Sequence, residues 1–288
     1  MTNEVDLIAT CWTIAGDFLP GADRTACPLP LGKRIAAAAS AGYTGIGFWH
    51  GDLVHFLAQG GRYRDLRKLL EVNGLRHIEL EYMGDWFTEG ERRQRADAMR
   101  RDLFAAADAL GARHIKVMAP FGNEGWPRQQ LIDEYGSLCA EAATHGLLMP
   151  IEMIPFSDLP TLDAVLDIAA GAGAANGGLL IDIWHVVRSG ASYEDILRVP
   201  ARYILAAELD DAELALHGDM HEDTMHHRRL CGEGEFDVPA FIDAMTRAGY
   251  RGPYGVEILS REHRRLPVAE AARRSFETAR TQFTDGAR

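Results

Sequence analysis

Four acidic side chains stand at the ends of four short apolar segments in the second half of the chain. Glu152, Asp182, Glu208 and Glu257 each alternate with apolar neighbours, as in the segment 151–153 (I-E-M). If these segments are strands, alternate side chains share a face and the acids point the same way. One such acid could pair with an arginine or cap a loop, but four in succession are harder to explain in that way.

Gathering four buried carboxylates without a cation is costly, because like charges force some of them to take up protons. Hard divalent cations prefer oxygen ligands. The four acids therefore predict a metal site for Mn²⁺ or Mg²⁺, with Co²⁺ or Zn²⁺ as further candidates.

The elements that position these acids follow a repeated unit, in which a helical stretch ends at glycine and a short β-rich segment follows. Glycine after a helix takes a left-handed conformation that other residues resist. Such units begin at Ala41, Asn73, Leu110, His145, Asn176 and Ala248. Segment 199–208 is a further unit, with proline as the breaker in place of glycine, and the opening strand at 6–12 brings the expected strands to eight. Strands alternating with helices predict an α/β fold, a (β/α)8 TIM barrel with a single domain over residues 1–288. An open doubly wound sheet is disfavoured, because no glycine-rich phosphate loop follows the first segment.

A barrel enzyme places its chemistry at the carboxyl ends of its strands, where further candidates lie. Trp12 and Trp49 end the first two expected strands and could form an apolar wall against a sugar, or simply close the barrel mouth. A buried lysine needs a partner, so Lys116 is expected to pair with Glu79 or Glu81 from the neighbouring strand. The alternative is that Lys116 or Glu81 touches the substrate near the metal.

The strand ends resemble those of the xylose-isomerase-like TIM barrels, the superfamily of sugar phosphate isomerases and epimerases that also includes inosose dehydratases and endonuclease IV. The similar pieces follow the family order from the fifth strand to the eighth. They are I-E-M at 151–153, D-I-W-H at 182–185, E-L-D-D at 208–211, R-R-L-C-G-E-G-E-F-D at 228–237 and G-Y-R-G-P-Y-G-V-E at 249–257.

This resemblance implies that Glu152, Asp182, Glu208 and Glu257 are the metal ligands. It also implies that two further residues bind substrate, His185 by contact and Arg229 through substrate oxygens. Many epimerases of the family carry His or Gln where this chain has Glu208, and an all-carboxylate set favours harder ions than zinc. The histidine-rich three-zinc cluster of endonuclease IV has no match at these strand ends.

The expected chemistry is that of a metal-dependent isomerase or epimerase acting on a small sugar or polyol-derived ketone. Glu152 and Glu257 would move a proton next to the carbonyl through a metal-stabilised enediolate. A dehydratase of the inosose or 3-dehydroshikimate kind would share the first step and then expel a hydroxyl group. An alternative of another class is a non-catalytic sugar-binding or partner subunit.

The composition of the chain limits the classes of partner and the cellular setting that we expect. The formal net charge of −12 and the absence of a basic cluster argue against nucleic acid. No apolar run reaches the roughly 18 residues that a membrane span needs. The four cysteines form no C-x-x-C pair and no signal peptide is recognisable, so a reduced cytoplasmic setting is expected. The oligomeric state stays open, a homo-oligomer included.

Overall fold

Eight parallel strands close into a barrel in the order β1 to β8, as the sequence predicted. The computed structural model describes residues 5–21, 24–122 and 124–283. The strands are β1 (Leu7–Ala9), β2 (Gly45–Trp49), β3 (His77–Met83), β4 (His114–Val117), β5 (Met149–Glu152), β6 (Gly177–Asp182), β7 (Ile204–Leu209) and β8 (Tyr254–Val256).

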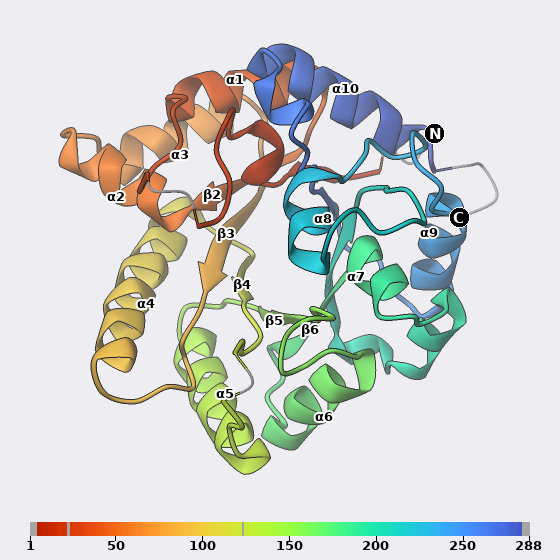
Figure 1. Ribbon diagram of the computed structural model, residues 1–288. Helices are drawn as coiled ribbons and strands as arrows, with labels where there is room; N and C mark the ends of the chain where they lie inside the picture. The colour runs from red at the N-terminus through yellow and green to blue at the C-terminus, as the bar shows by residue number, and fades with distance from the viewer. Residues whose placement is uncertain (1–4, 22–23, 123, 284–288) are drawn as a thin grey trace.

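Helices surround the barrel and connect successive strands (Figure 1). They are α1 (Leu31–Ala41), α2 (His50–Ala58), α3 (Tyr63–Val72), α4 (Gly90–Leu110), α5 (Arg128–Ala143), α6 (Leu162–Ala172), α7 (Ile183–Arg188), α8 (Met220–His226), α9 (Val238–Arg247) and α10 (Val268–Arg280). Short 3-10 helices are η1 (Trp12–Ile14), η2 (Tyr193–Arg198), η3 (Ala201–Tyr203) and η4 (His263–Arg265). No helix of the described residues is long and apolar enough to cross a membrane.

The end of the first strand differs from the sequence prediction. The first strand ends at Ala9, so Trp12 stands in the 3-10 turn η1 and not at the end of the strand. This difference arises where a turn replaces the last residues of an apolar run. The seventh strand begins at Ile204, after Pro200 and the short helix η3, in agreement with proline as the breaker before it.

The barrel register brings the acidic strand ends together. Asp182 of β6 lies opposite Glu208 of β7, and Glu208 lies opposite Gly255 of β8. Gly255 leaves room for the acid, because a Cβ at this position would lie 2.9 Å from Glu208 Cγ. The carboxyl ends of β5 to β8 thus form one continuous acidic edge.

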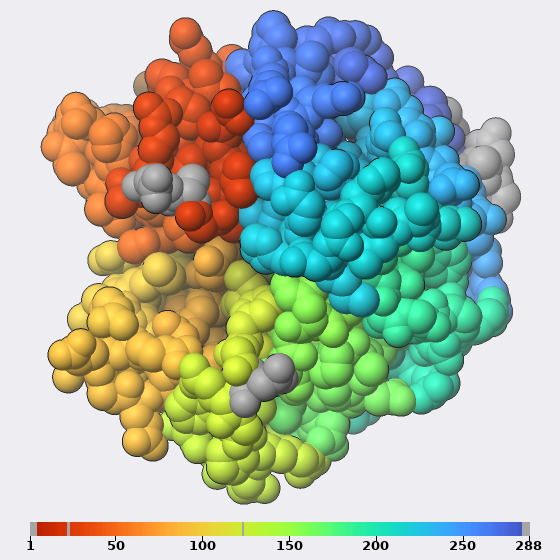
Figure 2. Space-filling view, in the orientation of Figure 1, coloured from red at the N-terminus to blue at the C-terminus, as the bar shows by residue number. Residues whose placement is uncertain are grey.

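A second, smaller apolar cluster covers this end of the barrel. It joins η1 to the loops after β7 and β8 through Trp12, Phe18, Met225 and Leu259. The cyan part of the chain, which includes α8, lies over the barrel end in the space-filling view (Figure 2). The acidic edge therefore sits beneath a partial cover and not in open solvent.

Candidate metal and active site

Glu152, Asp182, Glu208 and Glu257 converge, as their positions in the sequence predicted. Each offers a carboxylate oxygen, and these oxygens lie within 4.8 Å of one another. Asp182, Glu208 and Glu257 are buried, whereas the Glu152 side chain keeps 14% of its surface exposed. Glu152 is therefore the acid of this group that is most accessible to a ligand.

Asp182 also determines where His185 lies. The strand β6 ends at Asp182 and α7 begins at the next residue. Asp182 Oδ1 accepts hydrogen bonds from the backbone N–H groups of Trp184, at 2.7 Å, and His185, at 3.3 Å, and so caps the helix. This turn brings His185 Nε2 to 3.0 Å from Glu152 Oε1. The D-I-W-H spacing thus links an acid of the cluster to a histidine at the cavity.

Lys116 lies within the acidic cluster, in contact with acids from strands β3 and β7 and with the acid that follows β8. Its Nζ is 2.9 Å from Glu81 Oε1 and 3.4 Å from both Glu79 Oε1 and Glu257 Oε1, and it also pairs with Glu208. The expected ion pairs with Glu79 and Glu81 are therefore present. The contacts with Glu208 and Glu257 extend them across the barrel.

Arg228 is a residue of the cluster that sequence reasoning missed. Its side chain is buried, and Nη1 lies 2.7 Å from Asp182 Oδ2 and 3.3 Å from Glu257 Oε2, while also pairing with Asp210. The hydroxyl group of Thr224 accepts a further bond from Nη2 at 2.9 Å. Arg228 therefore neutralises charge on Asp182 and Asp210, and shares Glu257 with Lys116.

The structure does not bring Arg229, the arginine singled out in the sequence, to this cluster. Its side chain is 45% exposed and pairs with Glu213. Asp211 and Arg229 pair as an antiparallel bridge with backbone hydrogen bonds in both directions. Successive side chains of extended backbone point to opposite sides, so Arg228 faces inward and Arg229 outward. This alternation was the available signal, because only one of the two arginines could face the acids.

Acids outnumber cations in the cluster. Seven carboxylates meet two obligate cations there, the acids being Glu79, Glu81, Glu152, Asp182, Glu208, Asp210 and Glu257 and the cations Lys116 and Arg228. Burial raises the pKa of Glu208 and Glu257, and neighbouring carboxylates raise it further while Lys116 opposes them. Burial also raises the pKa of Glu81 to about 8. These groups must hold protons or share a cation, which is the condition that a divalent ion would satisfy.

A cavity of about 410 Å³ opens beside the acids. Its polar lining comprises Glu81, Glu152, His185, His221, Thr224, Arg228 and Glu257. Its walls are largely apolar and aromatic, with contributions from Trp12, Tyr82, Met118, Phe121, Phe156 and Leu259. Glu152 and Glu257, the expected proton-transfer pair, thus both reach the space that a small molecule would enter.

The expected substrate-binding residues differ in their access to this cavity. Trp12, Glu81 and His185 line it. Trp49 packs behind Trp12 and Tyr82, with ring centroids at 5.5 Å and 5.2 Å, and donates its indole N–H to Thr25 O. Lys116 is buried among the acids and stands outside the described lining. Tyr82, Met118, Phe121 and Phe156 went unnoticed in the sequence, because they lie in or beyond strand ends without a distinguishing pattern.

Comparison with known proteins gives consistent results. A family model described as xylose isomerase-like TIM barrel matches residues 35–282. A 3-dehydroshikimate dehydratase from Pseudomonas aeruginosa is 28% identical over 246 residues, 83% of this chain and 37% of that protein. An inosose isomerase from Bacillus velezensis is 24% identical over 188 residues, 62% of this chain and 65% of that protein. The chain thus spans little more than a third of the dehydratase's length.

Solved structures share the fold. A structure described as the IOLI protein with a binding zinc atom superposes with a TM-score of 0.83 at 16% identity, covering 97% of this chain and 99% of that one. A D-allulose 3-epimerase from Methylomonas sp., in complex with D-allulose, gives 0.70 at 17% identity, covering 97% and 98%. At these identities the likeness concerns the fold alone.

Proposed function

The chain belongs to the xylose isomerase-like TIM barrel family, and we propose that it is a metal-dependent enzyme that moves a proton next to the carbonyl group of a small polyhydroxylated ketone. The observation that carries the proposal is the convergence of Glu152, Asp182, Glu208 and Glu257 at the edge of a cavity lined by two of them. The leading reaction is isomerisation or epimerisation.

The residues present fit a divalent cation. Both carboxylate oxygens of Glu208 are buried without a hydrogen-bond donor of good geometry, and the cluster carries excess negative charge. Glu152, Asp182, Glu208 and Glu257 would hold the ion, and four carboxylates favour Mn²⁺ or Mg²⁺. When bound, such an ion supplies Lewis-acid polarisation of a substrate oxygen.

The side chains around the cavity would supply proton transfer and substrate binding. Glu152 and Glu257 are placed to take a proton from one carbon and to return it to the same or the adjacent carbon. His185 holds the Glu152 carboxylate through its hydrogen bond of 3.0 Å and can contact a substrate hydroxyl group. Arg228 faces the cavity and would bind a substrate oxygen, the role first expected of Arg229. The apolar walls exclude water and would pack against the carbon skeleton.

A dehydratase is the second candidate. Two 3-dehydroshikimate dehydratases, from Pseudomonas aeruginosa and Pseudomonas putida, match 83% and 84% of this chain. Such an enzyme would use the same proton abstraction and then expel a hydroxyl group β to the carbonyl. A non-catalytic subunit is less well supported, because all four acids stand together and two of them, Glu152 and Glu257, line the cavity.

NMR in deuterated water tests the proposal. The protein, supplied with Mn²⁺ or Mg²⁺, is incubated with a panel of ketoses, inososes and 3-dehydroshikimate. We expect deuterium in the product at the carbon next to the carbonyl, loss of turnover after chelation, and inactivity of a folded Glu152→Gln variant. Glu91→Gln, at a side chain that is 90% exposed, is the matched control and should retain activity. Full turnover by metal-free protein, or retention of the substrate hydrogen through a hydride shift, would contradict the proposed mechanism.

A further inference from the structure

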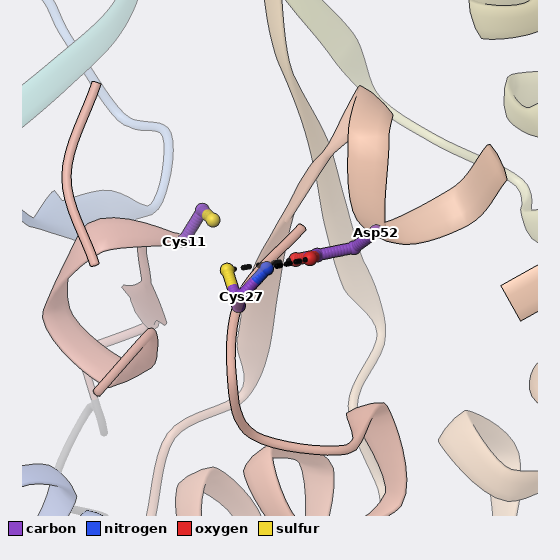
Figure 3. A group of neighbouring side chains, drawn as sticks. All are labelled: Cys11, Cys27 and Asp52. Carbon is purple, nitrogen blue, oxygen red and sulfur yellow. Dashed lines mark hydrogen bonds between the residues drawn. The ribbon is translucent and has the colours of Figure 1, made fainter. Parts of the chain in front are cut away.

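Two cysteines that are 16 positions apart in the sequence meet an aspartate beside the wall of the cavity. Cys11 follows β1, Cys27 precedes α1, and Asp52 lies in the first turn of α2 (Figure 3). The two sulfur atoms and an Asp52 carboxylate oxygen lie within 4.8 Å of one another. The site is separate from the four acids described above and has no role in the proposed proton transfer.

Hydrogen bonds hold both sulfur atoms in this arrangement. Cys27 donates its backbone N–H to Asp52 Oδ1 at 2.7 Å and its thiol to Asp52 Oδ2 at 3.1 Å (Figure 3). The buried guanidinium group of Arg34 pairs with Asp52 and donates to Cys11 Sγ at 3.2 Å. Cys11 is fully buried, whereas Cys27 is partly exposed. An oxidant from solvent would therefore meet Cys27 first.

A resident metal ion fits this site poorly. The guanidinium group of Arg34 already pairs with Asp52 and donates to Cys11 Sγ, so a cation already occupies the place beside both groups that a metal ion would need. Contact with the Cys11 sulfur and burial both raise the pKa of the Cys27 thiol. The Cys27 thiol must therefore lose its proton before it reacts with an oxidant, and Asp52 Oδ2, at 3.1 Å from the sulfur, is positioned to take that proton.

We propose that Cys11 and Cys27 form a reversible intramolecular disulfide in response to a peroxide. A disulfide requires the sulfur atoms to approach to about 2.05 Å, which rotation of the side chains must supply. The bond would join the two ends of the segment that carries Trp12, Pro20 and Gly21, three residues of the cavity wall. Oxidation would thereby restrain one wall of the cavity.

The chemistry balances with hydrogen peroxide as the oxidant. Cys27 gives its proton to Asp52, and its sulfur attacks a peroxide oxygen. The O–O bond breaks, leaving a sulfenic acid and a hydroxide that recovers the proton as water. The Cys11 sulfur then attacks the Cys27 sulfur, the S–O bond breaks, and the hydroxide leaves as water with the Cys11 proton. Two thiols lose two electrons and two protons, and one peroxide becomes two waters. A dithiol reductant reverses the reaction.

Mass spectrometry of the full chain tests the proposal. After hydrogen peroxide treatment and alkylation of the denatured protein, we expect two of the four thiols to be lost. We also expect a crosslinked peptide pair containing Cys11 and Cys27, and full recovery with dithiothreitol. Cys27→Ser should keep all of its remaining thiols under the same treatment, whereas Cys139→Ser, at a buried cysteine elsewhere, should still lose two.

Thermal unfolding provides a second readout. The oxidised chain should unfold at a higher temperature than the reduced chain, and the Cys27→Ser variant should show no such shift. Accumulation of a stable sulfenic or sulfinic acid at Cys27, a disulfide between two chains, or stoichiometric zinc that protects both thiols would each overturn the proposal.

Discussion

Lys116 and Arg228 each pair with several of the buried acids. Although burial opposes the effect, Lys116 lowers the pKa of Glu79 to about 2, and Arg228 lowers the pKa of Asp182. Glu208 contacts Lys116, and its pKa still rises because burial and Glu257 outweigh that contact. Each cation therefore fixes one acid in its charged form, while acids between the two cations remain available for an ion or a proton.

Arg228 and Arg229 give a matched pair of substitutions. Arg228→Ala leaves Asp182 and Asp210 buried without their cation, so we expect a loss of about 3–5 kcal/mol in the free energy of unfolding. Arg229→Ala removes an exposed pair with Glu213 and should change stability by less than about 1 kcal/mol. Urea unfolding of both variants measures the difference. Equal losses would mean that the inward and outward assignment is wrong.

His263 makes stability depend on pH. Its Nε2–H donates to Thr13 O at 2.9 Å, and burial lowers the pKa of the ring from 6.5 to about 4. Between these values the unfolded chain binds the proton and the folded chain does not, so stability falls as pH falls from 6.5 towards 4. By pH 5 this proton binding lowers the free energy of unfolding by about 2 kcal/mol. In His263→Gln this part of the pH dependence should vanish in unfolding measured from pH 7 to pH 5. An unchanged slope would assign the acid sensitivity to other groups.

At the scale of elements, close approach between neighbouring strands explains a glycine in β6. A Cβ on Gly178 would lie 2.3 Å from the backbone oxygen of Tyr203, just before β7. Gly178 N–H also donates to the hydroxyl group of Tyr135 in α5, at 2.9 Å. This tyrosine hydroxyl in turn donates to Met149 O in β5. The strand, its neighbour and the covering helix are thus fitted together at one backbone position.

Two glycine substitutions should have opposite signs. Gly178→Ala forces β6 and β7 apart, and we expect a loss of about 2 kcal/mol or more. Gly136→Ala lies inside α5, where the nearest atom to the added Cβ would be Ala172 Cβ at 3.8 Å. There the gain in helix propensity should stabilise the chain by about 0.5–1 kcal/mol. Denaturant midpoints of both variants provide the measurement, and destabilisation of similar size in both would refute the steric account.

Local patterns predicted the elements better than the contacts between them. The glycine-ended units and the alternation around each acid depend on neighbouring residues, so the strand order and the convergence of Glu152, Asp182, Glu208 and Glu257 could be anticipated. The choice between Arg228 and Arg229 depended on a bridge formed after the seventh strand. A short apolar run gave no sign that Trp12 would turn into a 3-10 helix. Such features arise from loops folding over one another, which a one-dimensional periodicity does not record.

At the scale of the whole molecule, barrel closure brings a cation from the first half of the chain into contact with acids from the second half. Lys116 of β4 reaches Glu208 of β7 and Glu257 after β8, although these residues are far apart in the sequence. Parallel strands contact only their neighbours through the backbone, so this link passes through side chains in the barrel interior. The excess negative charge of the cluster therefore opposes closure of the whole barrel.

Global stability should consequently respond to a divalent ion. An ion that binds only the folded chain adds about 2.7 kcal/mol at a concentration one hundred times its Kd, which corresponds to about 5 °C in Tm. We expect Mn²⁺ or Mg²⁺ to raise the Tm of chelator-treated protein. Glu208→Gln should weaken the response, and Glu91→Gln should leave it unchanged. A Tm that does not change with either ion would contradict binding at the four acids.

The capping of α7 by Asp182 has a consequence for how such a barrel can diversify. The same carboxylate that would hold an ion also caps the turn that carries His185, so a change at Asp182 would affect both the ion site and the position of the histidine. Replacing Asp182 would displace His185, whereas replacing the His185 side chain would leave the cap in place, because the cap uses backbone N–H groups. The aromatic residues Phe121 and Phe156 line the cavity from separate loops and have no such second role. New substrate preferences are therefore easiest to reach by changing these two aromatic residues, because such changes leave the Asp182 cap and the position of His185 undisturbed.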